Sequence, residues 1–384
     1  MAIHFERAEF AIRQERVLEA MAANRLDALV LFAPESMYWL TGYDTFGFCF
    51  FQAMVMTRTG RFVLITRAPD LRQAKATSIV EDVRVWVDRG TADPVGQLKE
   101  VLFELDLLGT NLGVEYDTQG LTAANGRKLD DGLESFATLI DASALIPALR
   151  AVKSPVEIAY AREAARLADL AYEAGLAEIR PGADEGRILA AMQGAVFAAG
   201  GDYPGNSFII GSGADALLCR YKTGRRRLDA RDQITLEFAG VWRQYHAALM
   251  RTVVIGAPTP RHLELHEAAR EALAAVEGAM RPGSTCGDVF DAHARVMDGR
   301  GLQPHRLNAC GYSLGARYAP SWMDPPMFYR GNQTPIEPNM ILFAHMILFD
   351  SETETAMTLG RTYLTTAADP EPLSRLPLEL AVVG

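Results

Sequence analysis

The sequence predicts an α+β protein of two domains, in which an α/β sandwich precedes a larger domain made of two related halves. Three observations carry this prediction. The chain has 384 residues, of which 49% are hydrophobic, enough to bury two cores. Strand-like and helix-like segments alternate over the first 150 residues, and a ten-residue segment recurs in the remainder.

The first domain, residues 1–150, alternates helical and extended patterns. Residues 13–23 have the spacing of an amphipathic helix. Short apolar runs follow, and each is typical of a buried strand: LDALVLF, AMVMTRTGRFVLIT, VEDVRVWV and LGVEY. Strands that alternate with helices predict a sheet covered by helices, which is an α/β sandwich.

The second domain, residues 151–384, opens with a helix start signal. In SPVE, the Ser154 hydroxyl can cap the helix, and Pro155 suits the first helical position. The Glu157 side chain can accept a hydrogen bond from the backbone N–H of Ser154, which completes a capping box. We expect a long helix from this point to about Glu178.

The repeat lies within this second domain. RPGADEGRIL at residues 180–189 recurs as RPGSTCGDVF at residues 281–290. Three glycine pairs keep one offset: Gly182 and Gly283, Gly186 and Gly287, and Gly200 and Gly301. A shared register of this kind indicates internal duplication, and we expect the two halves to face each other across a cleft.

Composition excludes several partners. With 38 basic and 48 acidic residues, the net charge of -10 repels nucleic acid and anionic membrane surfaces. The tripeptide Arg225–Arg227 is interpreted as a solvated turn. No run approaches the roughly 18 apolar residues that a membrane span needs, and the N-terminus lacks the apolar core of a signal peptide. We therefore expect a cytoplasmic protein.

The second domain resembles the creatinase and aminopeptidase P superfamily, which has the pita-bread fold. LRAVKSPVEIAYAREAARLADLAY, DQITLEFAGVWRQYHAALMRT, PNMILFAHMILF and LGRTYLTT follow the order of that family's landmarks. The resemblance implies an N-terminal creatinase-like α/β domain followed by a pita-bread domain with pseudo-twofold duplicated halves.

In the first domain, YWLTGYDTFGFCFFQAMVM looks like the strand–turn–strand segment of creatinases and ectoine hydrolases that reaches over the neighbouring subunit's active site. The resemblance therefore implies a homodimer. It also places Asp44, Phe48 and Phe50 as candidate substrate-binding residues in the partner's pocket.

The metal ligands of the peptidase members are mostly absent. Those members hold two metal ions with two aspartates, one histidine and two glutamates. The matching positions are Glu237, Ala248, Tyr312, His345 and Gly360 in this chain. A single ion on Glu237 and His345 would lack a third protein ligand. The sequence therefore predicts no metal and no other cofactor.

Metal-free branches of the superfamily act on other carbon–nitrogen bonds, creatinase on a guanidino group and ectoine hydrolase on a cyclic amidine. Such a carbon already carries positive charge, so a carboxylate that faces the cation and a base for water can suffice. Met250 and His345 stand where creatinase has glutamates, and Phe50 and Arg220 fall near its substrate arginine and catalytic histidine. Creatine itself is therefore a poor match.

Three residues are candidates for catalysis. Glu237 in ITLEFAG faces the cation unless it forms an ion pair with Arg251. His246 is a candidate base, with a surface hydrogen bond as the alternative. His345 would ordinarily be a core histidine, but it stands at a former ligand position.

Further candidates would bind substrate. The Tyr312 hydroxyl can orient it, and Tyr245 or His246 must face the cleft because strand neighbours alternate. Arg220 can hold a substrate carboxylate or form an ion pair with Asp215 or Asp229. Cys310 is a candidate nucleophile if its pKa is depressed, against the simpler interpretation of a buried thiol.

Three functions are compatible with these residues. The first is a metal-independent hydrolase of a small cyclic amidine or guanidino compound, similar to ectoine hydrolase or creatinase. The second is an Xaa-Pro peptidase with an atypical metal site. The third, from another class, is a catalytically silent protein that binds a small metabolite.

Overall fold

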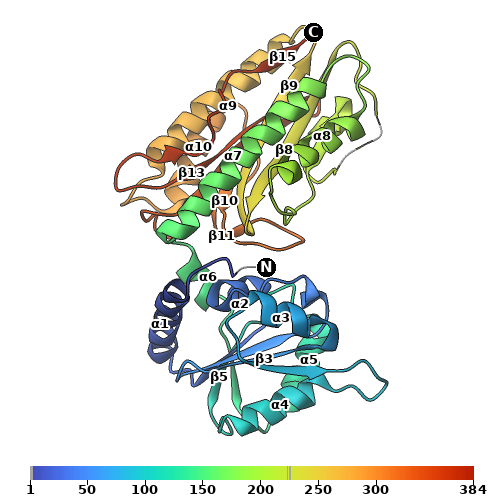
Figure 1. Cartoon of the computed structure of the whole chain (residues 1–384). Coiled ribbons are helices and arrows are strands. Elements are labelled where there is room, and N and C mark those ends of the chain that lie inside the picture. Colours follow the sequence, from blue (N-terminus) through green and yellow to red (C-terminus); the bar gives the residue numbers. More distant parts are fainter. Residues whose placement is uncertain (1–2, 223, 225) are drawn as a thin grey trace. The chain divides into compact units, whose positions relative to one another are not determined.

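The computed structural model describes residues 3–222, 224 and 226–384. The chain divides into two compact units, residues 1–150 and 151–384 (Figure 1). Within the described part of the chain, no helix combines the length and the apolar character needed to cross a membrane. Each unit has its own sheet and its own buried core.

A six-stranded mixed sheet forms the centre of unit one, in the order β4-β3-β2-β1-β5-β6. β1 is antiparallel to β2 and parallel to β5, and the outer pairs β3–β4 and β5–β6 are parallel. The strands are β1 (Ala28–Leu31), β2 (Ala53–Thr57), β3 (Phe62–Arg67), β4 (Asp82–Trp86), β5 (Asn111–Val114) and β6 (Thr138–Asp141).

Helices cover both faces of this sheet. Leu29 packs with α1 (Arg7–Ala23) and α2 (Pro34–Thr41), whereas its neighbour Val30 packs with α4 (Pro94–Glu104) and α5 (Ala123–Leu133). Successive side chains of this buried strand thus pack into two hydrophobic cores, one on each face of the sheet. The unit is the predicted α/β sandwich, completed by α3 (Leu71–Thr77) and α6 (Leu145–Arg150).

The segment that was predicted as strand–turn–strand has another structure. Tyr38 lies inside α2, which Pro34 starts and the left-handed Gly42 ends at φ 83°. A loop with the 3-10 turn η1 (Gly47–Cys49) then leads into β2. The prediction of a first strand was wrong because proline and glycine at the helix ends outweigh its aromatic composition.

Unit two is built on a nine-stranded sheet. Its main path is β11-β10-β12-β13-β9-β8-β7, while β14 pairs with β13 and β15 pairs with β9. The strands are β7 (Ile209–Ser212), β8 (Asp232–Trp242), β9 (Tyr245–Ile255), β10 (Ala309–Ser313), β11 (Asp324–Tyr329), β12 (Ile341–Asp350), β13 (Thr355–Leu364), β14 (Glu371–Pro372) and β15 (Ala381–Val383).

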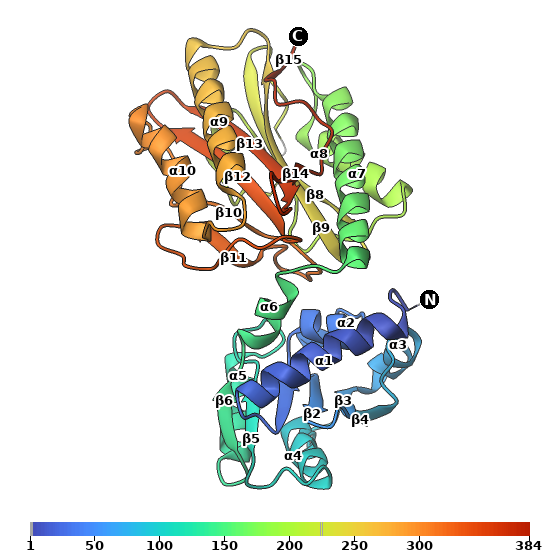
Figure 2. The ribbon, with the colours of Figure 1, turned by 90° about the vertical axis from the view of Figure 1, so that its left-hand side faces the viewer.

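Two helix pairs accompany this sheet, α7 (Pro155–Glu178) with α8 (Glu185–Ala198) and α9 (Pro260–Ala279) with α10 (Cys286–Gly299) (Figure 2). α7 packs on β8 and β9, and α9 packs on β12 and β13. The predicted capping box at Ser154 is present, since the Ser154 side chain and Glu157 bond each other's backbone N–H groups.

The duplication predicted from the glycines is confirmed. Gly182 and Gly283 both have positive φ, 78° and 93°, and both precede the second helix of a pair. Gly200 and Gly301 follow those helices with φ 85° and 73°. β9 of one half pairs with β13 of the other, so the halves form one pita-bread sheet with a pseudo-twofold relation.

Close approach of α7 to β8 depends on Gly240. A Cβ atom there would lie 2.0 Å from the Ala164 carbonyl oxygen. We predict that Gly240→Ala lowers the free energy of unfolding by about 1–3 kcal/mol, because overpacking displaces the helix. Urea unfolding followed by circular dichroism measures this change.

Gly194→Ala is the matched control, since nothing lies within 4 Å of a Cβ at that helical position. It should stabilise the protein by up to about 1 kcal/mol, because alanine favours a helix over glycine. Equal effects of the two substitutions would contradict the steric explanation.

Candidate active site

Glu237 lies in the middle of β8, paired with Met250 of β9 and Ile209 of β7. Its neighbour Phe238 stacks on Tyr172 of α7, so Glu237 points to the opposite face of the sheet. The side chain is only 8% exposed. A buried carboxylate in an apolar strand needs polar partners.

The alternative ion pair between Glu237 and Arg251 does not form. Arg251 donates instead to the carbonyl oxygens of Met250 and Gly360, at 2.8 and 2.6 Å. Strand alternation explains this, because Met250 rather than Arg251 pairs with Glu237.

Tyr312 of β10 is the polar neighbour of Glu237, and its hydroxyl lowers the pKa of that carboxyl. The Trp322 Nε1–H group donates to the Tyr312 hydroxyl oxygen at 2.9 Å. An indole N–H can only donate, so the tyrosine oxygen accepts there and its own proton is free for the carboxylate. This hydrogen bond from Trp322 orients the Tyr312 hydroxyl.

Electrostatics makes Glu237 titrate near neutrality. Burial raises its pKa to about 7, while the positive charge of Arg220 and the Tyr312 hydroxyl oppose the rise. The pKa of Tyr312 is raised well above its usual value by burial and by Glu237, so the hydroxyl stays protonated. At neutral pH the pair is thus a proton acceptor beside a proton donor.

Arg220 lies in the connection between the 3-10 turn η3 (Gly213–Leu217) and β8. Its side chain is exposed, yet its charge lowers the pKa of both Glu237 and His345. Within the described ranges, Arg220 forms no ion pair with Asp215 or Asp229. The exposed guanidinium group therefore acts on Glu237 and His345 without either of these aspartates as a partner.

His345 of β12 completes the cluster. Its ring centroid lies 5.6 Å from that of Tyr312 and 5.5 Å from that of Phe343. Burial lowers its pKa to about 3, and neighbouring His293 and Arg220 act in the same direction. The imidazole is therefore neutral, and its Nδ1 atom has no hydrogen-bond partner among the described residues.

We name these residues the Glu237 cluster: Arg220, Glu237, Tyr312, Trp322 and His345. The first two belong to the first half of unit two, and the other three to the second half. The cluster thus lies where the two halves meet, as expected for a site between duplicated halves.

His246 and Tyr245 have other partners. His246 is fully buried: its Nε2 atom accepts from the Gly205 N–H at 2.8 Å, and its Nδ1 atom lies 3.4 Å from the Gly315 carbonyl oxygen. The surface alternative is therefore wrong. Tyr245 points the other way and donates to Glu157 of α7 at 2.7 Å.

The remaining predicted residues lie in unit one. Phe50 is exposed and stacks under the Arg67 guanidinium group, whose carbon is 4.0 Å from the ring centroid. The Asp44 carbonyl oxygen accepts from the Gln73 amide at 2.8 Å, and Phe48 belongs to η1. The structure describes these surroundings within unit one, and their place in a partner's pocket stays a prediction.

The former ligand positions do not fit two metal ions. A Cβ atom at Gly360 would lie 2.7 Å from Phe343 Cζ and 2.9 Å from Met250 Cβ, so apolar groups occupy the space of a ligand there. Ala248 offers no side-chain donor atom. In residues 3–222, 224 and 226–384, no three or more His, Cys, Asp or Glu side chains form a group that could hold a metal ion.

Cys310 is fully buried, and burial raises the pKa of its thiol far above its usual value. A thiol in this environment is not a thiolate nucleophile at neutral pH. The buried-thiol interpretation therefore holds.

A separate hollow of about 470 Å³ lies elsewhere on unit two, and it contains none of the predicted site residues. Its lining consists of Phe290, Asp298, Gln303, Arg306, Asn308 and Arg330. Arg306 there is paired with Asp298 at 2.7 Å, which is an arrangement that stabilises the surface locally.

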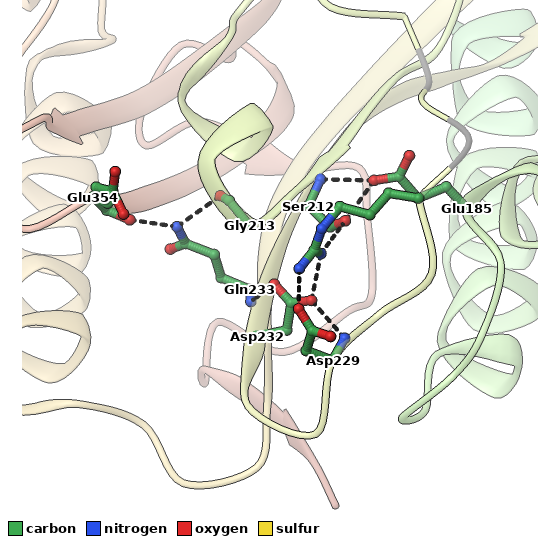
Figure 3. Close-up of polar contacts among 8 residues, drawn as sticks. Glu185, Ser212, Gly213, Asp229, Asp232, Gln233 and Glu354 are labelled. Carbon is green, nitrogen blue, oxygen red and sulfur yellow. Dashed lines mark hydrogen bonds and ion pairs between the residues drawn. The ribbon is translucent and has the colours of Figure 1, made fainter.

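Sequence reasoning also missed a polar network at the start of β8. Arg226 was interpreted as part of a solvated turn, but its side chain bridges Asp232 and Ser212, and Ser212 contacts Glu185 (Figure 3). Arg225 lies outside the described residues. The signal that could have located this network is the dense alternation of opposite charges at residues 226–232.

Comparisons with known proteins decide the family. The model described as metallopeptidase family M24 matches residues 159–367, more than half of the chain, and the creatinase/prolidase N-terminal domain matches residues 13–152. The chain belongs to metallopeptidase family M24. It is thus a hydrolase of this family with a creatinase N-terminal domain, as the resemblance implied.

Relatives of this M24 protein carry different names. An uncharacterized hydrolase/peptidase of Sinorhizobium fredii is 29% identical over 99% of both chains. The ectoine hydrolase of Halomonas elongata is 27% identical over all of this chain and 99% of its own length. An Xaa-Pro dipeptidase of Pyrococcus furiosus is 22% identical over 79% of this chain and 82% of its own length.

Solved structures share the M24 fold. The dipeptidase PepE of Mycobacterium ulcerans aligns with a TM-score of 0.86 at 24% identity, covering 99% of both chains. A prolidase of Thermococcus sibiricus aligns with a TM-score of 0.88 at 16% identity, covering 97% of this chain and 99% of its own. At these identities the likeness concerns the fold.

The raised pKa of Glu237 gives a stability prediction. Folding disfavours the ionised carboxylate, so stability is highest when it is protonated and falls as pH rises from 4.5 to about 7. A rise of this size corresponds to about 3 kcal/mol at 1.36 kcal/mol per pKa unit. As the pH rises from 4 to 8, the free energy of unfolding of Glu237→Gln should therefore increase by about 2–3 kcal/mol relative to that of the wild type.

Urea unfolding of both proteins across this pH range measures the gain. Glu267→Gln removes an exposed carboxylate from α9 and serves as control, since it should follow the wild type at every pH. A constant difference between Glu237→Gln and the wild type would show that folding does not raise the pKa of Glu237.

Proposed function

We propose that this M24 protein hydrolyses a carbon–nitrogen bond in a small cyclic amidine or guanidino compound without a metal ion, with ectoine as the first substrate to test. One observation carries the proposal: Glu237 is a buried carboxylate whose pKa is influenced by Tyr312 and Arg220, and the neighbouring ligand positions hold Ala248 and Gly360. The name of the Halomonas relative supports this choice.

Charge complementarity supports a zwitterionic substrate. Ectoine is a cyclic amidine that carries a carboxylate, so it has one positive and one negative group at neutral pH. In the proposal, Glu237 faces the amidinium and Arg220 binds the carboxylate. A buried anion close to an exposed cation suits such a substrate, because each charge lowers the other's desolvation cost.

Water supplies the nucleophile in this mechanism. The ionised Glu237 carboxylate takes a proton from water as the oxygen bonds to the amidine carbon, giving a tetrahedral intermediate. The proton then passes to one ring nitrogen, and its bond to carbon breaks. The products are an amide and an amine in one opened chain, so one water has been added overall.

His345 and Tyr312 assist through hydrogen bonds. Neutral His345 has an unpartnered Nδ1 atom among the described residues, which can orient the water or a ring N–H. Tyr312 keeps its proton and can donate to the oxygen as charge develops there. His246 is left out of proton transfer, because backbone groups contact both ring nitrogens.

The peptidase alternative has support from the folds of dipeptidases and prolidases. It requires metal ions at positions where Phe343 and Met250 pack against Gly360. The silent binding protein shares the cluster but needs no proton transfer. Turnover and its response to a chelator distinguish the three functions.

The first test incubates the purified protein with ectoine, hydroxyectoine, creatine or Ala-Pro, with and without EDTA, and follows substrate loss by mass spectrometry. We expect ectoine ring opening that EDTA does not reduce. Dipeptide cleavage that EDTA abolishes would establish the peptidase instead. Stabilisation by ectoine without turnover would establish the binding protein.

Glu237→Gln should lower kcat for ectoine by at least about a hundredfold, because the general base is lost. In the wild type, activity should rise with pH and reach half its maximum near pH 7, the pKa of Glu237. A profile that is flat between pH 5 and pH 9 would remove Glu237 from the proton-transfer step.

Arg220→Ala should raise KM for ectoine about tenfold or more through the lost carboxylate contact. It should also move the half-maximal pH upward, since the positive charge of Arg220 lowers the pKa of Glu237. Arg375→Ala, another exposed arginine of unit two, is the control and should change neither.

We also propose that the protein is a homodimer in which unit one of each subunit lies near the partner's active site. Phe46 is 83% exposed, and Phe50 of the same loop between α2 and β2 is also exposed. Exposed aromatic side chains of this kind support a contact with a partner subunit. Light scattering coupled to gel filtration gives the mass. A monomer would remove Asp44, Phe48 and Phe50 from the proposed site.

A further inference from the structure

A network of polar side chains that includes two buried carboxylates lies beside the connection that carries Arg220. We name Glu185, Ser212, Arg226 and Asp232 the Arg226 network (Figure 3). Glu185 is the first residue of α8 and is fully buried, and Ser212 is the last residue of β7. Asp232 starts β8, with 2% of its side chain exposed.

Arg226 joins these three elements. It donates to Asp232 Oδ2 at 2.5 Å and to Ser212 Oγ at 2.8 Å, and it also pairs with Asp229. Ser212 donates in turn to Glu185 Oε1, through its hydroxyl at 2.5 Å and its backbone N–H at 2.9 Å. Loss of the guanidinium group would leave the buried carboxylate of Asp232 without this cation.

Backbone contacts connect the network to the Arg220 segment, residues 218–222. The Ile210 N–H donates to the Lys222 carbonyl oxygen at 2.6 Å, and Ile209 pairs directly with Glu237. The Glu185 N–H donates to the Arg226 carbonyl oxygen at 3.1 Å. The Arg220 segment is therefore attached to β7, one strand from Glu237, and the chain beyond it to α8.

Gly224 shows how closely this chain passes the network. A Cβ atom there would lie 2.3 Å from Glu185 Oε2 and 2.7 Å from Tyr221 Oη. That carboxylate oxygen is buried and has no hydrogen-bond partner among the described residues. An alanine at position 224 would therefore require the Glu185 carboxylate and the Tyr221 hydroxyl, or the chain itself, to shift.

We propose that Arg226 is a positioning residue for the reaction: through Ser212, Glu185 and Asp232 it holds the Arg220 segment beside β7, and so keeps Arg220 where it binds the substrate carboxylate. This inference rests on the proposed function for its substrate. It extends that function from the groups that touch substrate to the network that places one of them.

Two variants test the network in the full-length protein. Arg226→Ala removes the bridging cation, and Gly224→Ala displaces the chain while every charge is retained. Arg300→Ala is the matched control, because Arg300 is also 32% exposed and pairs with Glu267 and Glu271 on α9. Hydrogen exchange of the peptides covering residues 213–228 and 246–255 reports local order.

We expect both variants to speed amide exchange in residues 213–228 by about tenfold or more and to leave residues 246–255 unchanged. KM for ectoine should rise about tenfold with kcat within about twofold, as expected for loss of one charged contact. Arg220→Ala combined with Arg226→Ala should raise KM no further than Arg220→Ala alone. Arg300→Ala should change none of these quantities.

Unchanged exchange in residues 213–228 would overturn the inference, and so would KM effects of Arg220→Ala and Arg226→Ala that multiply in the double variant. If the wild type leaves ectoine intact, the proposed function fails. Hydrogen exchange then still tests whether the Arg226 network holds the Arg220 segment in place, because this measurement needs no turnover.

Discussion

The antiparallel pairing of β9 with β13 is the contact on which the site depends. It joins the two duplicated halves of unit two into one sheet, with Gly360 opposite Met250. Met250 in turn lies opposite Glu237, so the centre of the sheet brings β8 of one half toward β10 and β12 of the other. Without this pairing, Glu237 would have neither Tyr312 nor the neighbourhood of His345.

Space at this junction is limited, and that constraint decides its chemistry. Gly360 leaves no room for a side chain beside Phe343 and Met250. The carboxylate of Glu237 therefore remains in a largely apolar environment, with a tyrosine hydroxyl and an arginine as its polar partners. Burial of this kind raises the pKa of a carboxyl toward neutrality, which is the range a general base requires.

The two histidines differ in their hydrogen-bond partners. Both ring nitrogens of His246 contact backbone groups, of Gly205 and Gly315, whereas the Nδ1 atom of His345 has no partner among the described residues. Both rings are buried and neutral, yet only one keeps a free hydrogen-bonding atom next to Tyr312. Two histidines of one sheet, on β9 and on β12 with β13 between them, thus differ in the hydrogen bonds that they can offer.

Local signals in the sequence determined the two-domain division, the capped helix at Ser154 and the duplicated halves, because proline, glycine and capping residues act within a few positions of the chain. The same local logic failed at Tyr38, where the helix ends were overlooked. Family motifs marked Glu237, Tyr312 and His345, whose strands are set by hydrophobic pattern.

Only the tertiary structure decided what those side chains contact. It gave Arg251 backbone partners instead of Glu237, gave Trp322 a hydrogen bond to Tyr312, and paired the half-buried Arg226 with the buried Asp232. Each of these contacts joins residues from different strands or from different loops. Sequence spacing cannot predict them, because long-range packing fixes the distance between such groups, and that distance determines both their hydrogen bonds and their pKa values.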